Sequence, residues 1–179
     1  MSRLVYSVIC SLDGYSTDAG GSFDWAAPSE EVVAFLNDQG RAATTYLYGR
    51  RMYQTMAVWE TDPTAAEISP QSAEFARIWQ AARKVVFSTT LTSVWTERTT
   101  LERSLTAEIV QRLKAESPGD LHVDGPTLAK SALALGVVDE LQVITVPVVV
   151  GVAPRSSRRD SGSTCACWTS GGSPTAWWR

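Results

Sequence analysis

The sequence predicts an α/β fold in which a mainly parallel central sheet is flanked by helices. Short runs rich in β-branched residues alternate along the chain with segments of helical periodicity, which is the pattern of strand–helix–strand units. The chain has 179 residues, of which 44% are hydrophobic and 20% are charged, so it can bury one sizeable core. We therefore expect one folded domain over residues 1–151, followed by an atypical tail.

The first elements are a buried strand, a loop and a helix. The run LVYSVICSL at residues 4–12 is apolar and rich in β-branched residues, and an Asp-Gly turn ends it. A loop rich in Gly, Ser and Asp follows over residues 15–27. Ser29 is suited to cap a helix whose first turn carries two exposed acidic residues, and Gly40 is suited to end it.

The next part of the chain repeats this alternation. Residues 44–48 (TTYLY) predict a short strand, and a short helix through Met56 follows it. Residues 60–70 are polar and contain two prolines, so we expect a loop there. Residues 71–82 have apolar side chains at helical spacing and predict an amphipathic helix.

The remaining elements continue in the same order. We expect strands at residues 84–87, 99–101, 120–123 and 140–150, and helices at residues 106–115 and 126–136. Thr106 is a good helix-capping residue, and Pro126 is favourable in the first turn of a helix.

Charge and cysteine content exclude several classes of function. The net charge is −3 and the pI is about 5.2, so the chain lacks the basic surface that nucleic-acid binding needs. Cys10, Cys165 and Cys167 form no disulfide framework, which favours a cytoplasmic location. The single histidine, His122, offers little for a metal site or a Ser-His-Asp triad, and we expect no metal.

The sequence also predicts no membrane segment. The N-terminus lacks the basic region, apolar region and cleavage site of a signal peptide. The most apolar run, residues 141–150, is shorter than the roughly 18–20 residues that span a bilayer.

Three junctions that follow strands carry residues suited to binding phosphates and sugars. The first opens a helix with glycine and two arginines, the second is rich in hydroxyl groups, and the third is a strand–glycine–helix turn. Each also fits an ordinary turn, but the carboxyl ends of parallel strands meet at one edge of a sheet, where a dinucleotide can bind. The candidate cofactor contacts are Gly49, Arg50, Arg51, Ser88, Thr89, Thr90, Leu91, Asp124, Gly125, Pro126, Thr127 and Leu128.

Two further residues are candidates for contact with a substrate. Asp13 follows the first strand at the same edge, where a carboxylate can orient an N–H-bearing heterocycle or supply a proton, directly or through water. Trp25, in the loop beside that edge, can stack on a flat ring. The structural alternatives are a turn residue for Asp13 and a core side chain for Trp25, and His122 is expected to be structural.

Six segments together resemble the bacterial dihydrofolate-reductase-like family that shares the C-terminal domain of the riboflavin-pathway reductase. They are SLDGY (11–15), FDWAAPSEE (23–31), TYLYGRRMYQTM (45–56), FARIW (75–79), KVVFSTTL (84–91) and DGPTLAKSALALGVVDELQVITVPVVVG (124–151). They occur in the order of the family and together cover about residues 3–151.

The resemblance implies a three-layer fold with NADPH lying along the edge of the sheet, in contact with the three junctions. It implies hydride transfer to a pteridine-, aminopyrimidine- or sugar-like substrate, with the cofactor supplying the hydride. It places Asp13 in the substrate pocket as the catalytic residue, and Tyr15, Trp25 and Tyr53 beside the substrate. It also implies a homodimer if the C-terminal strands are intact.

The chain departs from the family at two places. Asp124 stands where the family has the first glycine of a Gly-Gly pair, and a charge there is expected to weaken NADPH binding. After Gly151 the family continues with a glycine-rich turn, a phenylalanine and two strands, whereas this chain has VAPRSSRRD.

Residues 152–179 differ from the rest of the chain in composition. They hold three of the seven tryptophans and two of the three cysteines, but no Leu, Ile, Phe, Met or Tyr. One hypothesis is a disordered tail. Another is a shift of reading frame near Gly151, because one back-translation in a shifted frame gives strand-like alternation, and the DNA sequence would decide between them.

The sequence thus supports one leading function and two alternatives. The leading hypothesis is an NADPH-dependent reductase. A second enzyme hypothesis is 5-amino-6-(5-phosphoribosylamino)uracil reductase. The hypothesis of another class is a non-catalytic nucleotide-binding protein, or a degenerate relative of the reductases.

Overall fold

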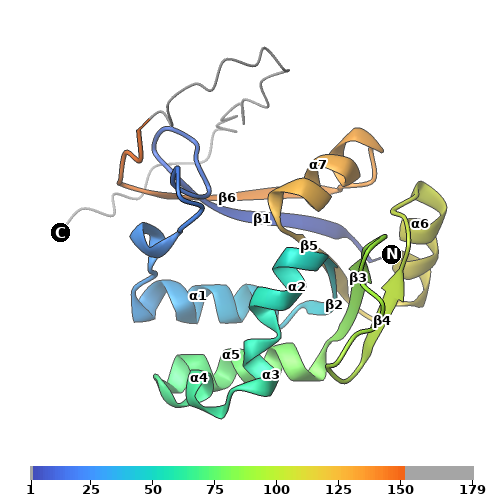
Figure 1. Ribbon diagram of the computed structural model, residues 1–179, viewed down its shortest axis with the longest axis horizontal. Helices are drawn as coiled ribbons and strands as arrows, with labels where there is room; N and C mark the ends of the chain where they lie inside the picture. Colours follow the sequence, from blue (N-terminus) through green and yellow to red (C-terminus); the bar gives the residue numbers. More distant parts are fainter. Residues whose placement is uncertain (1, 152–179) are drawn as a thin grey trace.

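A computed structural model describes residues 2–151, which form a six-stranded sheet with helices on both faces (Figure 1). The strands are β1 (Leu4–Ser11), β2 (Ala43–Gly49), β3 (Arg83–Phe87), β4 (Thr99–Glu102), β5 (Asp120–Asp124) and β6 (Glu140–Val146). Their order across the sheet is β4-β3-β2-β5-β1-β6, and every pair of neighbours is parallel. The prediction of an α/β fold with a parallel sheet is confirmed.

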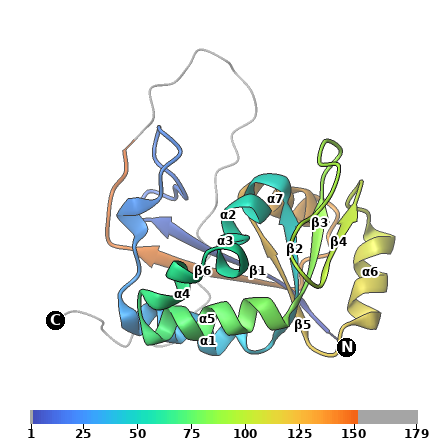
Figure 2. The ribbon, with the colours of Figure 1, turned by 60° about the horizontal axis from the view of Figure 1, so that its bottom comes forward.

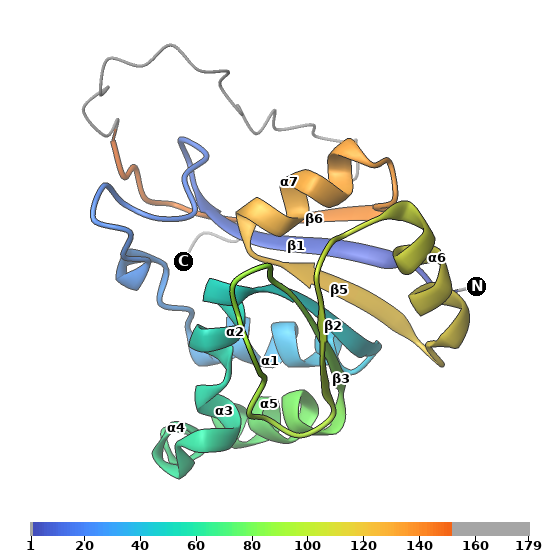
Figure 3. The ribbon, with the colours of Figure 1, turned by 45° about the vertical axis from the view of Figure 1, so that its right-hand side comes forward.

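The helices divide between the two faces of the sheet (Figure 3). They are η1 (Asp24–Ala26), α1 (Glu30–Gly40), α2 (Arg50–Met56), α3 (Val58–Thr61), α4 (Pro63–Glu67), α5 (Pro70–Ala81), α6 (Ala107–Glu116) and α7 (Pro126–Ala134). Helices α6 and α7 cover one face, and α1, α2 and α5 lie on the other. The parallel strands require such crossovers, because a chain that re-enters a sheet in the same direction must first return to its starting edge.

The core beneath α6 and α7 is almost entirely aliphatic. The side chains of Leu47, Leu121 and Val123 in the central strands are fully buried. They belong to one cluster with Val110 of α6 and Ala129 of α7. Both faces of these strands are buried, as in other parallel sheets covered by helices on both sides.

The core on the other face contains aromatic residues with polar atoms. Tyr48 of β2 and Trp79 of α5 are fully buried, and the Trp79 indole Nε1–H donates a hydrogen bond of 3.0 Å to the Tyr48 hydroxyl. Tyr46 stacks on Tyr48 with ring centroids 5.7 Å apart. A buried tyrosine and a buried tryptophan each need a partner for the polar atom, and here they satisfy each other.

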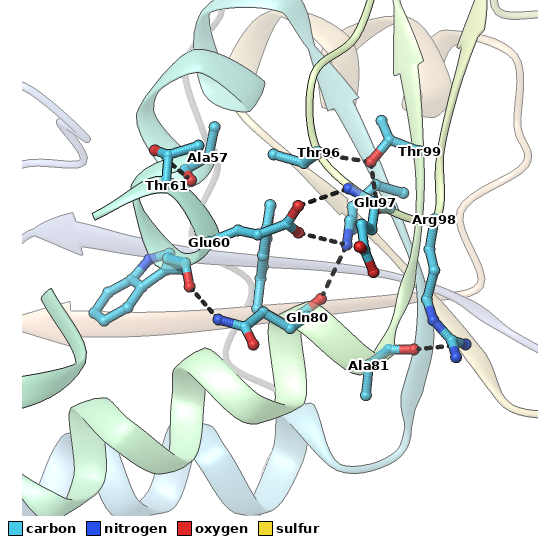
Figure 4. Close-up of polar contacts among 12 residues, drawn as sticks. Ala57, Glu60, Thr61, Gln80, Ala81, Thr96, Glu97, Arg98 and Thr99 are labelled. Atoms are coloured by element: carbon cyan, nitrogen blue, oxygen red, sulfur yellow. Dashed lines mark hydrogen bonds and ion pairs between the residues drawn. The ribbon is translucent and has the colours of Figure 1, made fainter. Parts of the chain in front are cut away.

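A buried ion pair joins this core to the chain between β3 and β4 (Figure 4). The Lys84 side chain has no exposed surface, and its Nζ lies 3.7 Å from Oε2 of Glu60 and 4.3 Å from the centroid of the Trp79 ring. The other carboxylate oxygen of Glu60 accepts a hydrogen bond of 2.6 Å from the backbone N–H of Glu97. Burial lowers the pKa of the Lys84 ammonium, and the Glu60 carboxylate opposes that shift.

Helix starts were predicted well from their capping residues. The Ser29 hydroxyl accepts from the backbone N–H of Val32, and the Thr106 hydroxyl accepts from that of Ile109. These bonds satisfy backbone donors that have no partner inside the helix.

The prediction of a loop over residues 60–70 was wrong. The structure has the end of α3 and the whole of α4 there. Asp62 caps α4 by accepting a hydrogen bond of 3.0 Å from the backbone N–H of Thr64, and Pro63 occupies the first turn, where its missing N–H costs nothing. The same proline that suggested a loop therefore begins a short helix.

The last predicted strand is shorter than expected. We predicted a strand over residues 140–150, but β6 ends at Val146, before Pro147. Proline cannot donate to a sheet ladder, so regular pairing stops there. One further bond, from the Leu12 backbone N–H to the Val148 carbonyl at 2.9 Å, keeps the chain beside the end of β1. The tail predicted after Gly151, with its two hypotheses, lies outside the described residues.

Candidate cofactor and substrate site

The predicted site residues gather at the carboxyl edge of the sheet. In the register of the strands, Gly49 of β2 lies opposite Phe87 of β3, and Tyr48 lies opposite Asp124 of β5. The three predicted junctions therefore follow three neighbouring strands, β3, β2 and β5. Strand β1 comes next, and Figure 2 shows the loop after it extending from the same edge as the end of β6.

The β2–α2 and β5–α7 turns lie against each other. A Cβ placed on Gly49 would come within 4.0 Å of the Leu128 Cβ, and a Cβ placed on Gly125 would come within 3.3 Å of the Met52 Cβ. Gly125 also has a φ of +89°, a conformation that side chains disfavour. A larger residue at 125 would therefore strain the backbone and push α2 away.

Arg50 and Arg51 begin α2 with their side chains exposed. No carboxylate among residues 2–151 forms an ion pair with either of them, whereas four other arginines are paired in this way. Those four are Arg3, Arg41, Arg83 and Arg112. Guanidinium groups without partners beside two glycine turns make a suitable donor set for phosphates.

The third junction, residues 88–91, is an ordered turn rather than an open row of hydroxyls. The Ser88 hydroxyl is buried and accepts from the backbone N–H groups of Thr90 and Leu91, at 3.2 and 3.0 Å. Thr89 and Thr90 are exposed and Leu91 is half-buried. In this arrangement Ser88 shapes the turn, and the threonine hydroxyls are the groups that a ligand can reach.

Arg103 holds this turn from the end of β4, and the sequence interpretation missed it. Its Nη1 donates to the carbonyls of Ser88 and Leu91, at 3.2 and 2.6 Å. The sequence places Arg103 after a short expected strand but gives no sign that it reaches a turn that lies earlier in the chain.

Asp124 is the unexpected member of the group. Burial raises the pKa of its carboxyl to about 7. Within the described part of the chain its carboxylate has no hydrogen-bond donor and no cation. Its negative charge also raises the pKa of the Tyr46 and Tyr48 phenols, whose own burial is the larger cause. A carboxyl group in this state carries a proton in much of the protein at neutral pH.

Asp13 contrasts with Asp124, because its surroundings lower its pKa. Its carboxylate accepts hydrogen bonds from the Ser11 hydroxyl at 2.6 Å, from the Gly151 backbone N–H at 2.9 Å and from the Val150 backbone N–H at 3.2 Å. The Ser11 bond is the main reason that the pKa of Asp13 lies below its usual value. Asp13 is therefore ionised at neutral pH and suited to accept a hydrogen bond rather than to give up a proton.

Tyr15 and Trp25 lie in the loop that follows β1. Both are half-buried. The Tyr15 backbone N–H donates to the Ser11 hydroxyl at 2.9 Å, and the Trp25 indole N–H donates to the Ser22 carbonyl at 3.3 Å. The loop thus holds both residues by local bonds and leaves part of each ring accessible.

Tyr53 does not lie where the resemblance placed it. Its side chain is 0% exposed, and its hydroxyl accepts from the backbone N–H groups of Trp95 and Thr96, at 2.9 and 3.1 Å. This phenol has no surface to offer a substrate, because the chain between β3 and β4 folds over it. We correct its role to that of a core residue.

His122 is buried in β5, away from the carboxyl edge, and its ring meets the Tyr46 ring edge-on with centroids 6.0 Å apart. Burial lowers its pKa, so it is neutral at physiological pH.

A surface hollow of about 500 Å³ lies at the opposite, amino edge of the sheet, where Thr44, Arg83 and Ser117 are among its lining residues. The hollow lies at the other end of the strands from the candidate site, because Thr44 and Arg83 stand at the starts of β2 and β3 and Ser117 follows α6. Two of its three arginines are paired, Arg41 with Asp38 and Glu74, and Arg83 with Glu116, while Arg98 donates to the Ala81 carbonyl. We therefore place the candidate site at the carboxyl edge.

Two absences apply to residues 2–151. No helix there is both long and apolar enough to cross a bilayer. No three side chains of His, Cys, Asp or Glu gather there in a way that could hold a metal ion.

Comparison with known proteins adds a family and a fold. The sequence profile of the family described as RibD C-terminal domain matches residues 3–167. The protein YyaP of Bacillus subtilis (strain 168), which is described as uncharacterized, is 26% identical over 152 residues, or 83% of this chain and 77% of YyaP.

Two solved structures share the fold. A putative riboflavin biosynthesis protein from Shewanella sp. PV-4 aligns with a TM-score of 0.60 and 21% identity, over 84% of this chain and 79% of that protein. A diaminohydroxyphosphoribosylaminopyrimidine deaminase/5-amino-6-(5-phosphoribosylamino)uracil reductase from Thermotoga maritima aligns with a TM-score of 0.54 and 14% identity, over 84% of this chain and 46% of that protein. This chain thus spans about half the length of the Thermotoga protein.

Proposed function

Because the chain belongs to the RibD C-terminal domain family, we propose that it is an NADPH-dependent reductase acting on a pteridine- or aminopyrimidine-like heterocycle. The observation that carries the proposal is the pair of guanidinium groups, Arg50 and Arg51, without ion-pair partners in residues 2–151, where two glycine turns meet. NADPH carries three phosphate groups, and such a donor set suits them.

In this proposal the residues of the carboxyl edge bind different parts of the cofactor. Arg50 and Arg51 bind phosphate oxygens, and the exposed hydroxyls of Thr89 and Thr90 bind sugar or phosphate oxygens. Gly49 and Gly125, with Pro126 to Leu128 behind them, let the backbone approach the pyrophosphate closely. When bound, the cofactor supplies the hydride.

The substrate end of the site lies at the neighbouring strand. The ionised Asp13 accepts hydrogen bonds from ring or amino N–H groups of the heterocycle, and so fixes its orientation for hydride transfer. The low pKa assigns Asp13 to orientation, and the proton that the reduced substrate needs comes from water. Trp25 and Tyr15 offer ring faces for stacking.

The second enzyme candidate is 5-amino-6-(5-phosphoribosylamino)uracil reductase. The family match supports it as the narrower form of the same activity. It requires a second phosphate site for the ribose phosphate of the substrate, separate from the cofactor contacts. Turnover with the phosphoribosyl substrate but not with its phosphate-free analogue would favour this candidate.

The candidate of another class is a non-catalytic nucleotide-binding protein or a degenerate relative. The half-buried carboxylate of Asp124 at the proposed pyrophosphate contact is the observation that favours it. Oxidation of NADPH in the presence of a pterin or aminouracil substrate would exclude this candidate.

The first test is binding of NADPH and NADH, followed by tryptophan fluorescence at pH 6.5. We expect saturable binding that favours NADPH. The double variant Arg50→Ala/Arg51→Ala should weaken NADPH binding about tenfold or more, since a hydrogen bond to a charged group contributes about 1.5–3 kcal/mol.

The matched control is Arg77→Ala, which removes another exposed arginine, on α5 and away from the carboxyl edge. Its affinity should equal that of the unchanged protein. If the protein is folded by circular dichroism and binds neither dinucleotide, the proposed function is wrong.

A further inference from the structure

Asp124 is the last residue of β5 and is followed directly by the turn that starts α7. Gly125, the next residue, has a φ of +89° and packs against Met52 of α2. Asp124 lies opposite Tyr48 of β2, so its backbone stands where the β2–α2 and β5–α7 turns meet. In the proposed function a dinucleotide uses both turns, and its phosphates or ribose then pass close to Asp124.

The groups around Asp124 do not stabilise its negative charge. From β2 it faces the phenols of Tyr46 and Tyr48, which burial keeps neutral, and the Tyr48 hydroxyl accepts the Trp79 N–H. Helix α2 begins with Arg50 and Arg51 and α7 carries Lys130, but neither helix forms an ion pair with it in the described part of the chain. Asp124 is half-buried, and its carboxylate forms no hydrogen bond or ion pair with the described residues. Burial of a carboxylate that lacks such partners favours the neutral acid.

We propose that cofactor binding by this chain is coupled to protonation of Asp124, so that the neutral carboxyl group accepts the dinucleotide and the ionised one repels it. The proposal deepens the proposed function and rests on it. The proton comes from solvent, and no bond of the cofactor changes. As a neutral acid, Asp124 has an O–H that donates to a phosphate or ribose oxygen, whereas the carboxylate only accepts.

Thermodynamic linkage gives the measurable consequence. If the bound state requires the proton, the affinity for NADPH falls about tenfold for each pH unit above the pKa of Asp124 in the free protein. Below that pKa the affinity is independent of this group. By reciprocity, the bound cofactor raises the pKa of Asp124 by the same free energy.

The experiment is isothermal titration of NADPH into the full chain at pH 7.8, in two buffers with different ionisation enthalpies. The difference between the buffers gives the number of protons taken up for each NADPH bound. The 2′-phosphate of NADPH also titrates near neutral pH, so the same titration is run with Asp124→Asn, which removes only the contribution of the side chain. Asp124→Gly is the second variant, in case the amide disturbs folding.

We expect the unchanged protein to take up close to one more proton per NADPH than Asp124→Asn does. Between pH 6.5 and 8.5 its affinity should fall by at least about tenfold more than that of either variant. Equal proton uptake and parallel pH profiles in all three proteins would overturn the coupling, while the binding itself would leave the proposed function standing. If all three are folded and none binds NADPH at either pH, both proposals fail.

Discussion

At the scale of single residues, the clearest feature is that two aspartates at one sheet edge are held in opposite states. Asp13 is surrounded by donors, the Ser11 hydroxyl and two backbone N–H groups, which stabilise its charge. Asp124 has burial without donors, which destabilises its charge. The same type of side chain is therefore ionised at neutral pH in one position and partly protonated in the other.

The state of Asp124 predicts how stability depends on pH. Its pKa in the folded protein is about 7, above the usual value of 3.8, so between about pH 4 and pH 7 the folded state binds more protons than the unfolded state. Stability is therefore lost as pH rises through this window, at up to about 1.4 kcal/mol per unit. Asp124→Asn should raise the free energy of unfolding at pH 8, by roughly 2–4 kcal/mol, and change it little at pH 4.

Urea denaturation at the two pH values measures this difference. Asp18→Asn, in the loop after β1, is a control for the general effect of removing an acidic group. If Asp124→Asn raises the free energy of unfolding equally at pH 4 and pH 8, the pKa of Asp124 is not raised in the folded state.

The buried pair of Lys84 and Glu60 predicts an asymmetry between its two members. Glu60→Gln leaves the Lys84 ammonium buried without a counter-charge and should cost about 1–3 kcal/mol of stability. Lys84→Met leaves the Glu60 carboxylate without its cation, but Glu60 is 20% exposed and keeps the Glu97 N–H, so this variant should cost less stability than Glu60→Gln.

Equilibrium denaturation of both variants and of the double variant tests this. In the Lys84→Met background, the cost of Glu60→Gln should largely disappear. If Glu60→Gln costs the same in both backgrounds, the hydrogen bond to Glu97 is the contribution that matters.

At the scale of elements, the turns at the carboxyl edge are shaped by residues from other elements. Gly125 of the β5–α7 turn packs on Met52 of α2, and Arg103 at the end of β4 binds two carbonyls of the turn after β3. Each turn is thus fixed by a neighbour in the sheet, which is how parallel strands place several loops in one site.

Arg103 predicts a local change that leaves the fold intact. Arg103→Ala frees the carbonyls of Ser88 and Leu91, so the backbone amides of Thr90 and Leu91 should exchange with solvent about tenfold faster or more, with little change in thermal stability. If the turn contacts NADPH, the Arg103→Ala variant should also bind NADPH a few-fold more weakly. Arg112→Ala, which removes another exposed arginine with an ion pair, serves as the control. Unchanged exchange at residues 90 and 91 would mean that Ser88 alone holds the turn.

At the scale of the whole molecule, the sheet has one flank that residues 2–151 leave uncovered. Strand β6 is last in the sheet order, and its side chains alternate between half-buried and exposed. Leu141 is 47% exposed and Val143 is 39% exposed, on the same side of the strand. An apolar strand with a free edge favours association between molecules.

We therefore expect Leu141→Lys to reduce concentration-dependent association without lowering thermal stability, because a lysine on an edge strand opposes pairing. Light scattering across a range of protein concentrations measures the effect. Ile68→Lys changes another exposed apolar residue, which lies between α4 and α5, and should leave association unchanged. If both variants behave alike, the edge of β6 is not the associating surface.

The sequence by itself determined the alternation of elements and the sheet edge to which the candidate site residues belong. Ser29 and Thr106 marked helix starts, and short runs rich in apolar and β-branched residues marked the strands, because capping and β propensity are local in sequence. The family resemblance and the three junctions came from contiguous motifs. Where a local signal has two uses, as Pro63 has in a loop or a first helical turn, the sequence prediction was wrong.

The tertiary structure decided which groups of the candidate site have hydrogen-bond partners and which are buried. Tyr53 is a core residue because the distant chain at Trp95 and Thr96 covers it. Arg103 holds the turn after β3 because β4 ends beside β3. Asp13 and Asp124 cannot be told apart from sequence, since one closely follows a strand and the other ends one. Their difference arises from donors and burial that chain segments far apart in sequence supply, and a pKa responds to that surrounding rather than to the residue type.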